Sequence, residues 1–114
     1  MRSETDSATL REMLHHIDLA ERFGQGRSFE SLRDDLMPLY AVIRCLEIIS
    51  EASRRLSDEL KARHNHIPWR EMAAAGNFYR HKYENVLPLR VWKTLQEDLP
   101  PLRTIIEQEL ATSA

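Results

Sequence analysis

Residues 36–60 read LMPLYAVIRCLEIISEASRRLSDEL, with apolar side chains recurring every three or four positions. Because an α-helix has 3.6 residues per turn, this spacing collects the apolar side chains on one face. Pro38 falls in the first turn, where its missing N–H would have no helical partner. The pattern therefore predicts one amphipathic helix of about seven turns. The predicted apolar face holds Leu36, Leu39, Tyr40, Ile43, Leu46, Ile49, Ser53, Leu56 and Leu60.

The residues before this stretch predict two helices. The first runs from about Ser7 to Phe23 and ends at Gly24-Gln25-Gly26, because glycine tolerates the left-handed conformation that terminates helices. Its apolar face holds Leu10, Met13, Leu14, Ile17 and Ala20. Ser28 is a preferred N-cap residue type, and it predicts a short helix from Phe29 to Arg33.

The residues after it predict further helices. Residues 63–66 interrupt the apolar stripe and are expected to form a loop, and Pro68 then suits the first turn of a helix through roughly Tyr79, whose end Gly76 and Asn77 should weaken. A last apolar stripe runs from residue 91 to residue 110, past Pro100-Pro101. This proline pair should kink or divide the helix, because Pro100 cannot donate a backbone hydrogen bond. The sequence therefore predicts an all-α, up-and-down bundle of four or five helices.

The length and composition restrict the class of protein. The 114 residues fit one domain, residues 1–114. Cys45 is the single cysteine, and its apolar neighbours favour a buried thiol in a reducing compartment. The chain has no run of roughly 18 apolar residues that would span a membrane, and its start lacks the apolar run of a signal peptide. We therefore expect a cytoplasmic protein that does not enter a membrane.

The charge is distributed unevenly along the chain. Residues 61–93 carry seven Lys or Arg and two Glu, whereas the whole chain has a formal net charge of −2. The seven cations are Lys61, Arg63, Arg70, Arg80, Lys82, Arg90 and Lys93. Such a basic window can attract nucleic acid or an acidic protein surface, and charge alone does not distinguish these partners.

Within this window, residues 76–83 read GNFYRHKY and combine an amide, two cations, a histidine and two tyrosines. An unperturbed imidazole titrates near pH 6.5, so His81 can act as a proton donor or acceptor at neutral pH. Cations beside such an imidazole can offset charge that develops on a phosphodiester. The segment therefore predicts phosphodiester chemistry centred on His81.

The chain resembles the HepT-like family of minimal-nuclease toxins, within the HEPN superfamily. The resemblance rests on residues 47–57, on Ile67-Pro68-Trp69, on Asn77 with His81 and Tyr83, and on residues 91–102. It implies a homodimeric, metal-independent endoribonuclease toxin that acts on RNA without a cofactor. It also implies a nucleotidyltransferase antitoxin of the MNT type, which in some members adds AMP to the motif tyrosine; no DNA or membrane partner is expected.

Carried over to this chain, the resemblance makes Asn77 the motif asparagine, His81 the catalytic histidine and Tyr83 the modification site. The usual motif arginine is replaced by Gly76, and neighbouring Arg80 is expected to supply a guanidinium in its place. Lys82 and Arg70 are expected to contact the RNA.

Other interpretations of the same residues remain open. If the substitution by Gly76 has removed the nuclease chemistry, the chain is a non-catalytic subunit that binds the nucleotidyltransferase and accepts AMP on Tyr83. A third interpretation is a helical dimerisation module. Tyr79 is better explained as a packing aromatic than as a site residue. The histidines at positions 15, 16, 64 and 66 lack the additional ligands of a zinc site, so no metal is expected.

Overall fold

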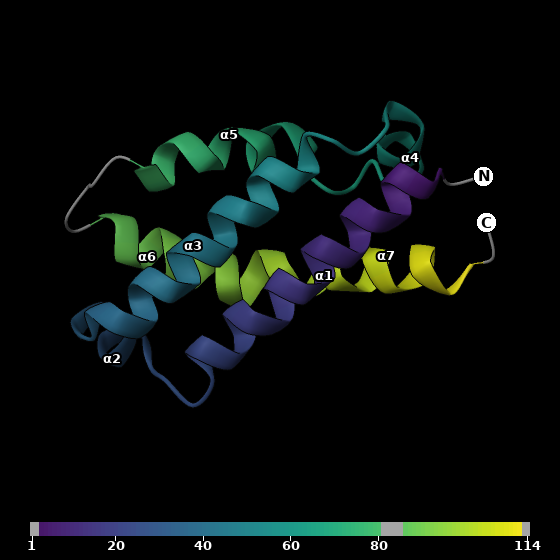
Figure 1. Ribbon diagram of the computed structural model, residues 1–114. Helices are drawn as coiled ribbons and strands as arrows, with labels where there is room; N and C mark the ends of the chain where they lie inside the picture. Colours follow the sequence, from purple (N-terminus) through teal and green to yellow (C-terminus); the bar gives the residue numbers. More distant parts are fainter. Residues whose placement is uncertain (1–2, 81–85, 113–114) are drawn as a thin grey trace.

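Two long helices, α1 (Glu4–Gly24) and α3 (Leu36–Ser53), lie side by side and run in opposite directions in the computed structural model (Figure 1). The structure describes residues 3–80 and 86–112. The short helix α2 (Phe29–Asp34) joins α1 to α3, and α4 (Asp58–Arg63) leads from α3 to α5 (Trp69–Arg80). The chain then continues through α6 (Val86–Lys93), the π-helical segment η1 (Thr94–Asp98) and α7 (Leu99–Ala111). This arrangement confirms the predicted all-α bundle.

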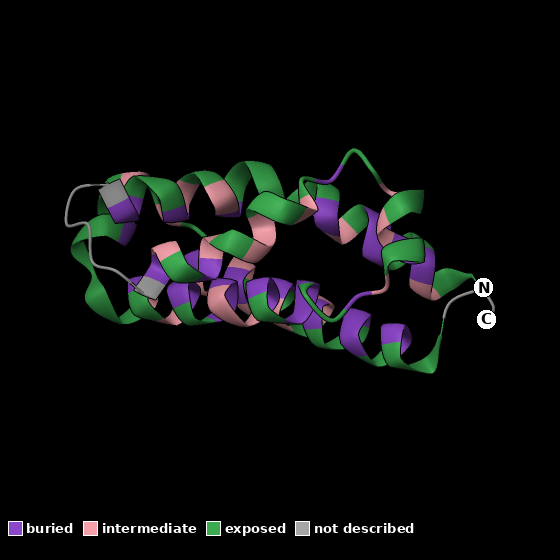
Figure 2. Ribbon diagram, turned by 90° about the horizontal axis from the view of Figure 1, so that it is seen from above, coloured by how far each residue is buried: buried purple, intermediate pink, exposed green. Residues whose placement is uncertain are grey.

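The core lies along the α1–α3 pair, which is covered by α5 on the α3 side and by α7 on the α1 side. Burial is confined to the inward faces of the helices, and the outward faces are exposed along the length of the bundle (Figure 2). The fully buried core side chains include Leu10, Met13, Ile17, Val42, Leu60, Val91 and Ile106. Except for Val42, these residues belong to the apolar stripes from which the helices were predicted, so helical periodicity is the main determinant of the fold. Leu36 and Tyr40, which were predicted to lie on the apolar face of residues 36–60, are exposed.

The turn between α1 and α2 forms as its residue types suggest. Gly26 adopts a φ of +74°, which lies in the left-handed region that favours glycine. Ser28 then caps α2: its Oγ accepts from the Ser31 N–H at 3.1 Å, and the Ser31 Oγ accepts from the Ser28 N–H at 3.0 Å. Both predictions for this turn are confirmed.

The prediction of one helix from Leu36 to Leu60 is wrong, because α3 ends at Ser53 and α4 begins at Asp58. Ser57 separates the two helices. Its Oγ accepts from the Leu60 N–H and caps α4, while its own N–H and hydroxyl donate to the buried Asp6 carboxylate at 3.0 and 2.6 Å. A residue of α1 therefore fixes the break.

The proline pair divides the last apolar stripe, as predicted. The Leu99 N–H donates to the carbonyl of Thr94, five residues earlier, and closes the π-helical segment η1, which ends at Asp98. Pro100 and Pro101 then occupy the first turn of α7, where the absence of an N–H costs little. Among the helices of residues 3–80 and 86–112, none is both long enough and apolar enough to cross a membrane.

Candidate functional site

Ser50 of α3 holds the turn of α5 that precedes the candidate motif. Its buried hydroxyl donates to the carbonyl of Met72 at 2.8 Å and also lies 3.2 Å from that of Ala73. The Gly76 N–H donates back to the Ser50 Oγ at 3.1 Å, and the Arg54 guanidinium donates to the Ala73 carbonyl at 2.7 Å. Polar contacts from α3 therefore position the helix that carries the motif.

Two of the predicted site residues, Arg70 and Asn77, lie on one outward face of α5. Asn77 is exposed, whereas Gly76 is buried against α3. Arg70, which is also exposed, precedes Asn77 by seven residues, or about two turns, so both belong to the same face of the helix. The predicted RNA contact Arg70 and the motif amide therefore share one surface.

The α-helix continues without a break through Gly76 and Asn77 to Arg80, its last residue. The predicted end of this helix at roughly Tyr79 is therefore confirmed to within one residue, and the contact with Ser50 supports the turn that contains Gly76. The predicted residues His81, Lys82 and Tyr83 lie outside the described residues.

Tyr79 faces the interior. It is 6 % exposed, and its hydroxyl lies 3.2 Å from the Thr94 Oγ1 in η1. Burial raises the pKa of the Tyr79 phenol, and the hydrogen bond to Thr94 and the charge of Arg90 oppose that rise. The interpretation of Tyr79 as a packing aromatic agrees with this position, although its hydroxyl bonds to Thr94 rather than reaching water.

Arg90, Thr94 and Asp98 form a polar group that the sequence analysis did not single out. The Arg90 guanidinium carbon lies 5.4 Å from the centre of the Phe78 ring, a cation–π distance. Desolvation raises the pKa of the Asp98 carboxyl, and the positive charge of Arg90 opposes that rise. The sequence contains a pattern that could have predicted this group. The three residues follow one another at intervals of four, which brings side chains together on one face of a helix.

A cavity of about 140 Å³ lies between α3, α5 and the α6–η1–α7 run. Its floor is formed by buried apolar side chains, and its rim by exposed polar ones. The floor includes Leu46, Ile49, Ile67, Leu99 and Leu102, and the rim includes His66, Glu71, Arg90 and Asp98. An apolar pocket with a few polar groups at its mouth is the usual form of a small-molecule site.

Among the described residues of the basic window, Arg63 and His64 contact carboxylates. Arg63 donates to the Glu109 carboxylate at 2.9 and 3.2 Å, and His64 Nε2 lies 2.6 Å from the same carboxylate. Arg63 also forms an ion pair with Glu59 at 3.4 Å. The hydrogen bond from Arg63, with a further one from His64, lowers the pKa of Glu109 to about 2. These two residues therefore tie α7 to the end of α4.

In the described ranges, no group of three or more His, Cys, Asp or Glu side chains is arranged to hold a metal ion. His64 is held by Glu109, and its ring packs edge-on against that of His66 at 6.3 Å. Cys45 is buried, which raises the pKa of its thiol. A low-pKa nucleophile is therefore not formed at Cys45.

Residues 13–109 match the family described as ribonuclease HepT-like. A probable ribonuclease HepT of Thermococcus cleftensis is 39 % identical over 99 residues, which cover 87 % of this chain and 90 % of that protein. A protein of Caldanaerobacter subterraneus, named "putative RNase", is 34 % identical over 107 residues, covering 90 % and 95 %. One of the same description from Methanocaldococcus jannaschii is 32 % identical over 100 residues, covering 88 % and 92 %. No solved structure matches the chain.

Proposed function

Because this chain belongs to the ribonuclease HepT-like family, we propose that it is a metal-independent endoribonuclease whose site is centred on His81. The substrate is RNA, and the reaction is cleavage of an internal phosphodiester. The observation that supports the proposal is the exposed face of α5. This face presents Arg70 and Asn77, and His81 follows the helix in the sequence. Ser50 and Arg54 hold this part of α5 against α3.

In the proposed reaction, the ribose 2′-oxygen attacks the adjacent phosphorus while a base takes its proton. The bond from phosphorus to the 5′-oxygen then breaks, and an acid protonates the leaving oxygen. The products are a 2′,3′-cyclic phosphate and a free 5′-hydroxyl. His81 can serve as either the acid or the base near neutral pH. Two copies of His81, one from each protomer of a dimer, would provide both.

Negative charge develops on the pentavalent phosphate. Hydrogen-bond donors accelerate the reaction only if they bind this phosphate more strongly in the transition state than in the ground state. Arg80 is proposed to supply the guanidinium, with Lys82 as a second cation and Asn77 as the group that orients the substrate or His81. Arg70, two turns before Asn77 on the same face, is proposed to contact a more distant phosphate.

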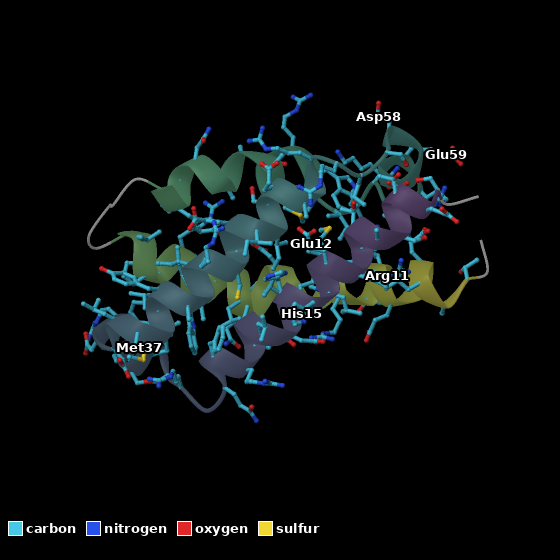
Figure 3. All side chains as sticks on the ribbon, in the orientation of Figure 1. Arg11, Glu12, His15, Met37, Asp58 and Glu59 are labelled. Carbon is cyan, nitrogen blue, oxygen red and sulfur yellow. The ribbon has the colours of Figure 1, made fainter. Side chains whose placement is uncertain are left out.

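The test is cleavage of RNA by purified protein in EDTA, with analysis of the product ends. The wild type is expected to leave 2′,3′-cyclic phosphates, and His81→Ala is expected to lose cleavage. His15→Ala is the matched control, because His15 is an exposed histidine on α1 (Figure 3). Equal activity of the two variants, or no cleavage by the wild type, would contradict the proposal.

We further propose that the active form is a homodimer. Among the residues that the structure describes, four large apolar side chains are exposed: Leu36 (56 %), Met37 (83 %), Tyr40 (51 %) and Leu89 (44 %). Met37 lies at the end of the bundle where α3 begins, near α2 (Figure 3). α5 ends and α6 begins at that same end (Figure 1). A dimer through these side chains would bring two motifs toward one interface and remove exposed apolar surface from water.

Sedimentation velocity tests the dimer. Met37→Lys is expected to shift the protein toward monomer and to lower RNA cleavage with it, because a charge would have to be desolvated in the interface. His15→Lys places the same charge on α1 and is expected to leave the dimer intact. A dimer that resists Met37→Lys together with Leu89→Lys would not use these side chains.

A second candidate function follows from Gly76, which has no side chain and is buried. If no other guanidinium takes the role of an active-site arginine, the chain would be a catalytically degenerate subunit. It would bind a nucleotidyltransferase antitoxin of the MNT type and accept AMP on Tyr83. In the first candidate the same partner would restrain an active toxin.

Coexpression with the neighbouring nucleotidyltransferase gene, followed by mass spectrometry, distinguishes the two candidates. An AMP adduct on Tyr83 in a protein that never cleaves RNA would support the second. Cleavage by the unmodified protein that disappears on modification would support the first. Arg80→Ala adds a direct check, because loss of cleavage in this variant would identify Arg80 as the guanidinium that takes the role of the motif arginine.

A further inference from the structure

The cavity between α3, α5, η1 and α7 has the form of a site for a flat ring. Its floor consists of apolar side chains from α3, α5 and α7 and of Ile67, and Ala75 on α5 leaves space where a larger side chain would fill it. An apolar cavity of roughly 150 Å³ accommodates a benzene molecule. The volume here, about 140 Å³, is therefore that of a single six-membered ring.

The polar groups at the cavity suit the edge of a heterocycle. The Tyr79 and Thr94 hydroxyls lie 3.2 Å from each other, and both residues line the cavity together with Arg90 and Asp98. A guanidinium donates to ring nitrogens and carbonyl oxygens, and a carboxylate accepts from exocyclic amino groups. Proteins recognise bases of single-stranded RNA by this combination of an apolar slot and edge hydrogen bonds.

We propose that this cavity binds a nucleobase, held by its ring in the apolar floor and read at its edge by Arg90 and Asp98. The base comes from the RNA substrate or from a free nucleotide, and the assignment to RNA rests on the function proposed above. An apolar side chain of another protein would fit the floor but would leave Arg90 and Asp98 without a role.

The position of the cavity relative to Asn77 sets which base of an RNA it takes. Ala75 and Tyr79 are four residues apart and share the inward face of α5, whereas Asn77 is two residues from each and lies on the opposite face. An α-helix is about 10 Å across. The captured base is therefore not the one at the cleaved phosphate but lies at least one nucleotide away along the strand. Arg90, which lines the cavity and also stacks on Phe78, is placed to guide the strand around α5.

The test fills the cavity and uses a matched control. Ala75→Phe places a ring in the cavity from α5. Ala62→Phe adds the same ring at an exposed position of α4 that does not line the cavity. The first measurement is calorimetric titration with adenosine, guanosine, cytidine and uridine, which carry no phosphate charge. We expect at least one nucleoside to bind the wild type and Ala62→Phe, with affinity reduced at least tenfold in Ala75→Phe.

The second measurement compares cleavage of a dinucleotide and a hexanucleotide. Ala75→Phe is expected to raise the KM for the hexanucleotide at least tenfold and to leave dinucleotide cleavage unchanged, because only the longer substrate reaches the cavity. Ala62→Phe should change neither. If Ala75→Phe weakens nucleoside binding but leaves the KM for the hexanucleotide unchanged, the site binds free nucleotides. If it raises the KM for the hexanucleotide but leaves nucleoside binding unchanged, the site binds RNA.

Asp98→Asn keeps the size of the side chain and guards against a folding defect in Ala75→Phe. It is expected to weaken cytidine relative to uridine at least threefold, because cytosine presents an amino group where uracil presents a carbonyl. If the wild type cleaves no RNA, the titrations still test the site. The proposal is overturned if folded Ala75→Phe matches the wild type in both measurements. It is also overturned if no nucleoside binds and Ala75→Phe alters only self-association, since the cavity would then hold a protein side chain.

Discussion

Ser50 and Gly76 are joined across the α3–α5 interface by a hydrogen bond of 3.1 Å, in which the Gly76 N–H donates to the serine hydroxyl. The same hydroxyl donates to the carbonyl of Met72, one turn earlier. A single buried side chain of α3 thus contacts both ends of one turn of α5. The position of the candidate motif depends on this serine.

Replacement of that serine should loosen α5 without unfolding the protein. Ser50→Ala removes a buried hydrogen-bonded hydroxyl and is expected to lower the free energy of unfolding by about 1–2 kcal/mol. The Gly76 amide should also exchange its hydrogen faster. Ser53→Ala is the control, because the Ser53 hydroxyl is equally buried but donates to a carbonyl of its own helix. Hydrogen exchange that is unchanged at Gly76 in Ser50→Ala would show that packing alone holds α5.

Acid should weaken the contact between α4 and α7. The pKa of Glu109 is lowered from 4.5 to about 2 in the folded protein, so the unfolded chain binds a proton more readily. The stabilising contribution is therefore complete above pH 4.5 and is lost as the pH falls toward 2, with a size on the order of 2 kcal/mol. Urea denaturation as a function of pH should show this loss in the wild type.

Glu109→Gln removes the carboxylate and is expected to flatten the pH dependence of stability between 4.5 and 2. Glu107→Gln provides the control on the same helix, because the Glu107 side chain is 56 % exposed. A Glu109→Gln protein that keeps the full acid sensitivity of the wild type would place its cause elsewhere.

Two glycines should respond differently to alanine. A Cβ at Gly24 would lie 2.5 Å from the Leu95 Cδ2, so Gly24→Ala overpacks the core and is expected to cost about 1–3 kcal/mol. At Gly26 nothing lies within 4 Å of the new Cβ, and the cost there, about 1–2 kcal/mol, comes from the positive φ. Adding Leu95→Ala should recover part of the loss for Gly24→Ala and none for Gly26→Ala. Equal coupling in the two double-mutant cycles would refute this explanation.

The break between α3 and α4 should be sensitive to Asp6. Asp6→Ala leaves the Ser57 N–H and hydroxyl without their carboxylate partner and is expected to cost about 2–3 kcal/mol. Asp6→Asn keeps one carbonyl acceptor for the N–H and should cost about 1 kcal/mol less than Asp6→Ala. Thermal unfolding of the two variants measures the difference. If they are equally stable, the hydrogen bonds from Ser57 contribute little.

The parts of the fold that were predicted correctly depend on residues close together in the sequence. The apolar stripe of α1, the N-cap Ser28 and the division at Pro100 are local signals, and local interactions determine them. The end of α3 was predicted wrongly because Leu56 and Leu60 continue the helical spacing. The contact that ends the helix comes from Asp6, 51 residues away, and no local pattern reveals it.

The candidate site shows the same division. Asn77 could be singled out because its neighbours form a short motif, and the structure places it on an exposed face. The cavity could not be predicted, because its walls come from α3, α5, η1 and α7 and exist only once these elements pack. Arg90 and Asp98 were therefore not identified as a pair, although their spacing from Thr94 is visible in the sequence.

The π-helical segment has a consequence for the phase of the side chains around the helix axis. In an α-helix, four residues exceed one full turn by about 40°, so a row of residues at this interval winds gradually around the helix. In η1 the turn holds more residues, so four of them fall short of a full turn. The rotation about the helix axis from Arg90 to Thr94 exceeds a full turn, and the rotation from Thr94 to Asp98 falls short of one, so the two deviations nearly cancel. Arg90 and Asp98 return to nearly the same azimuth two turns apart, and one extra residue in the winding keeps both charges at the same opening.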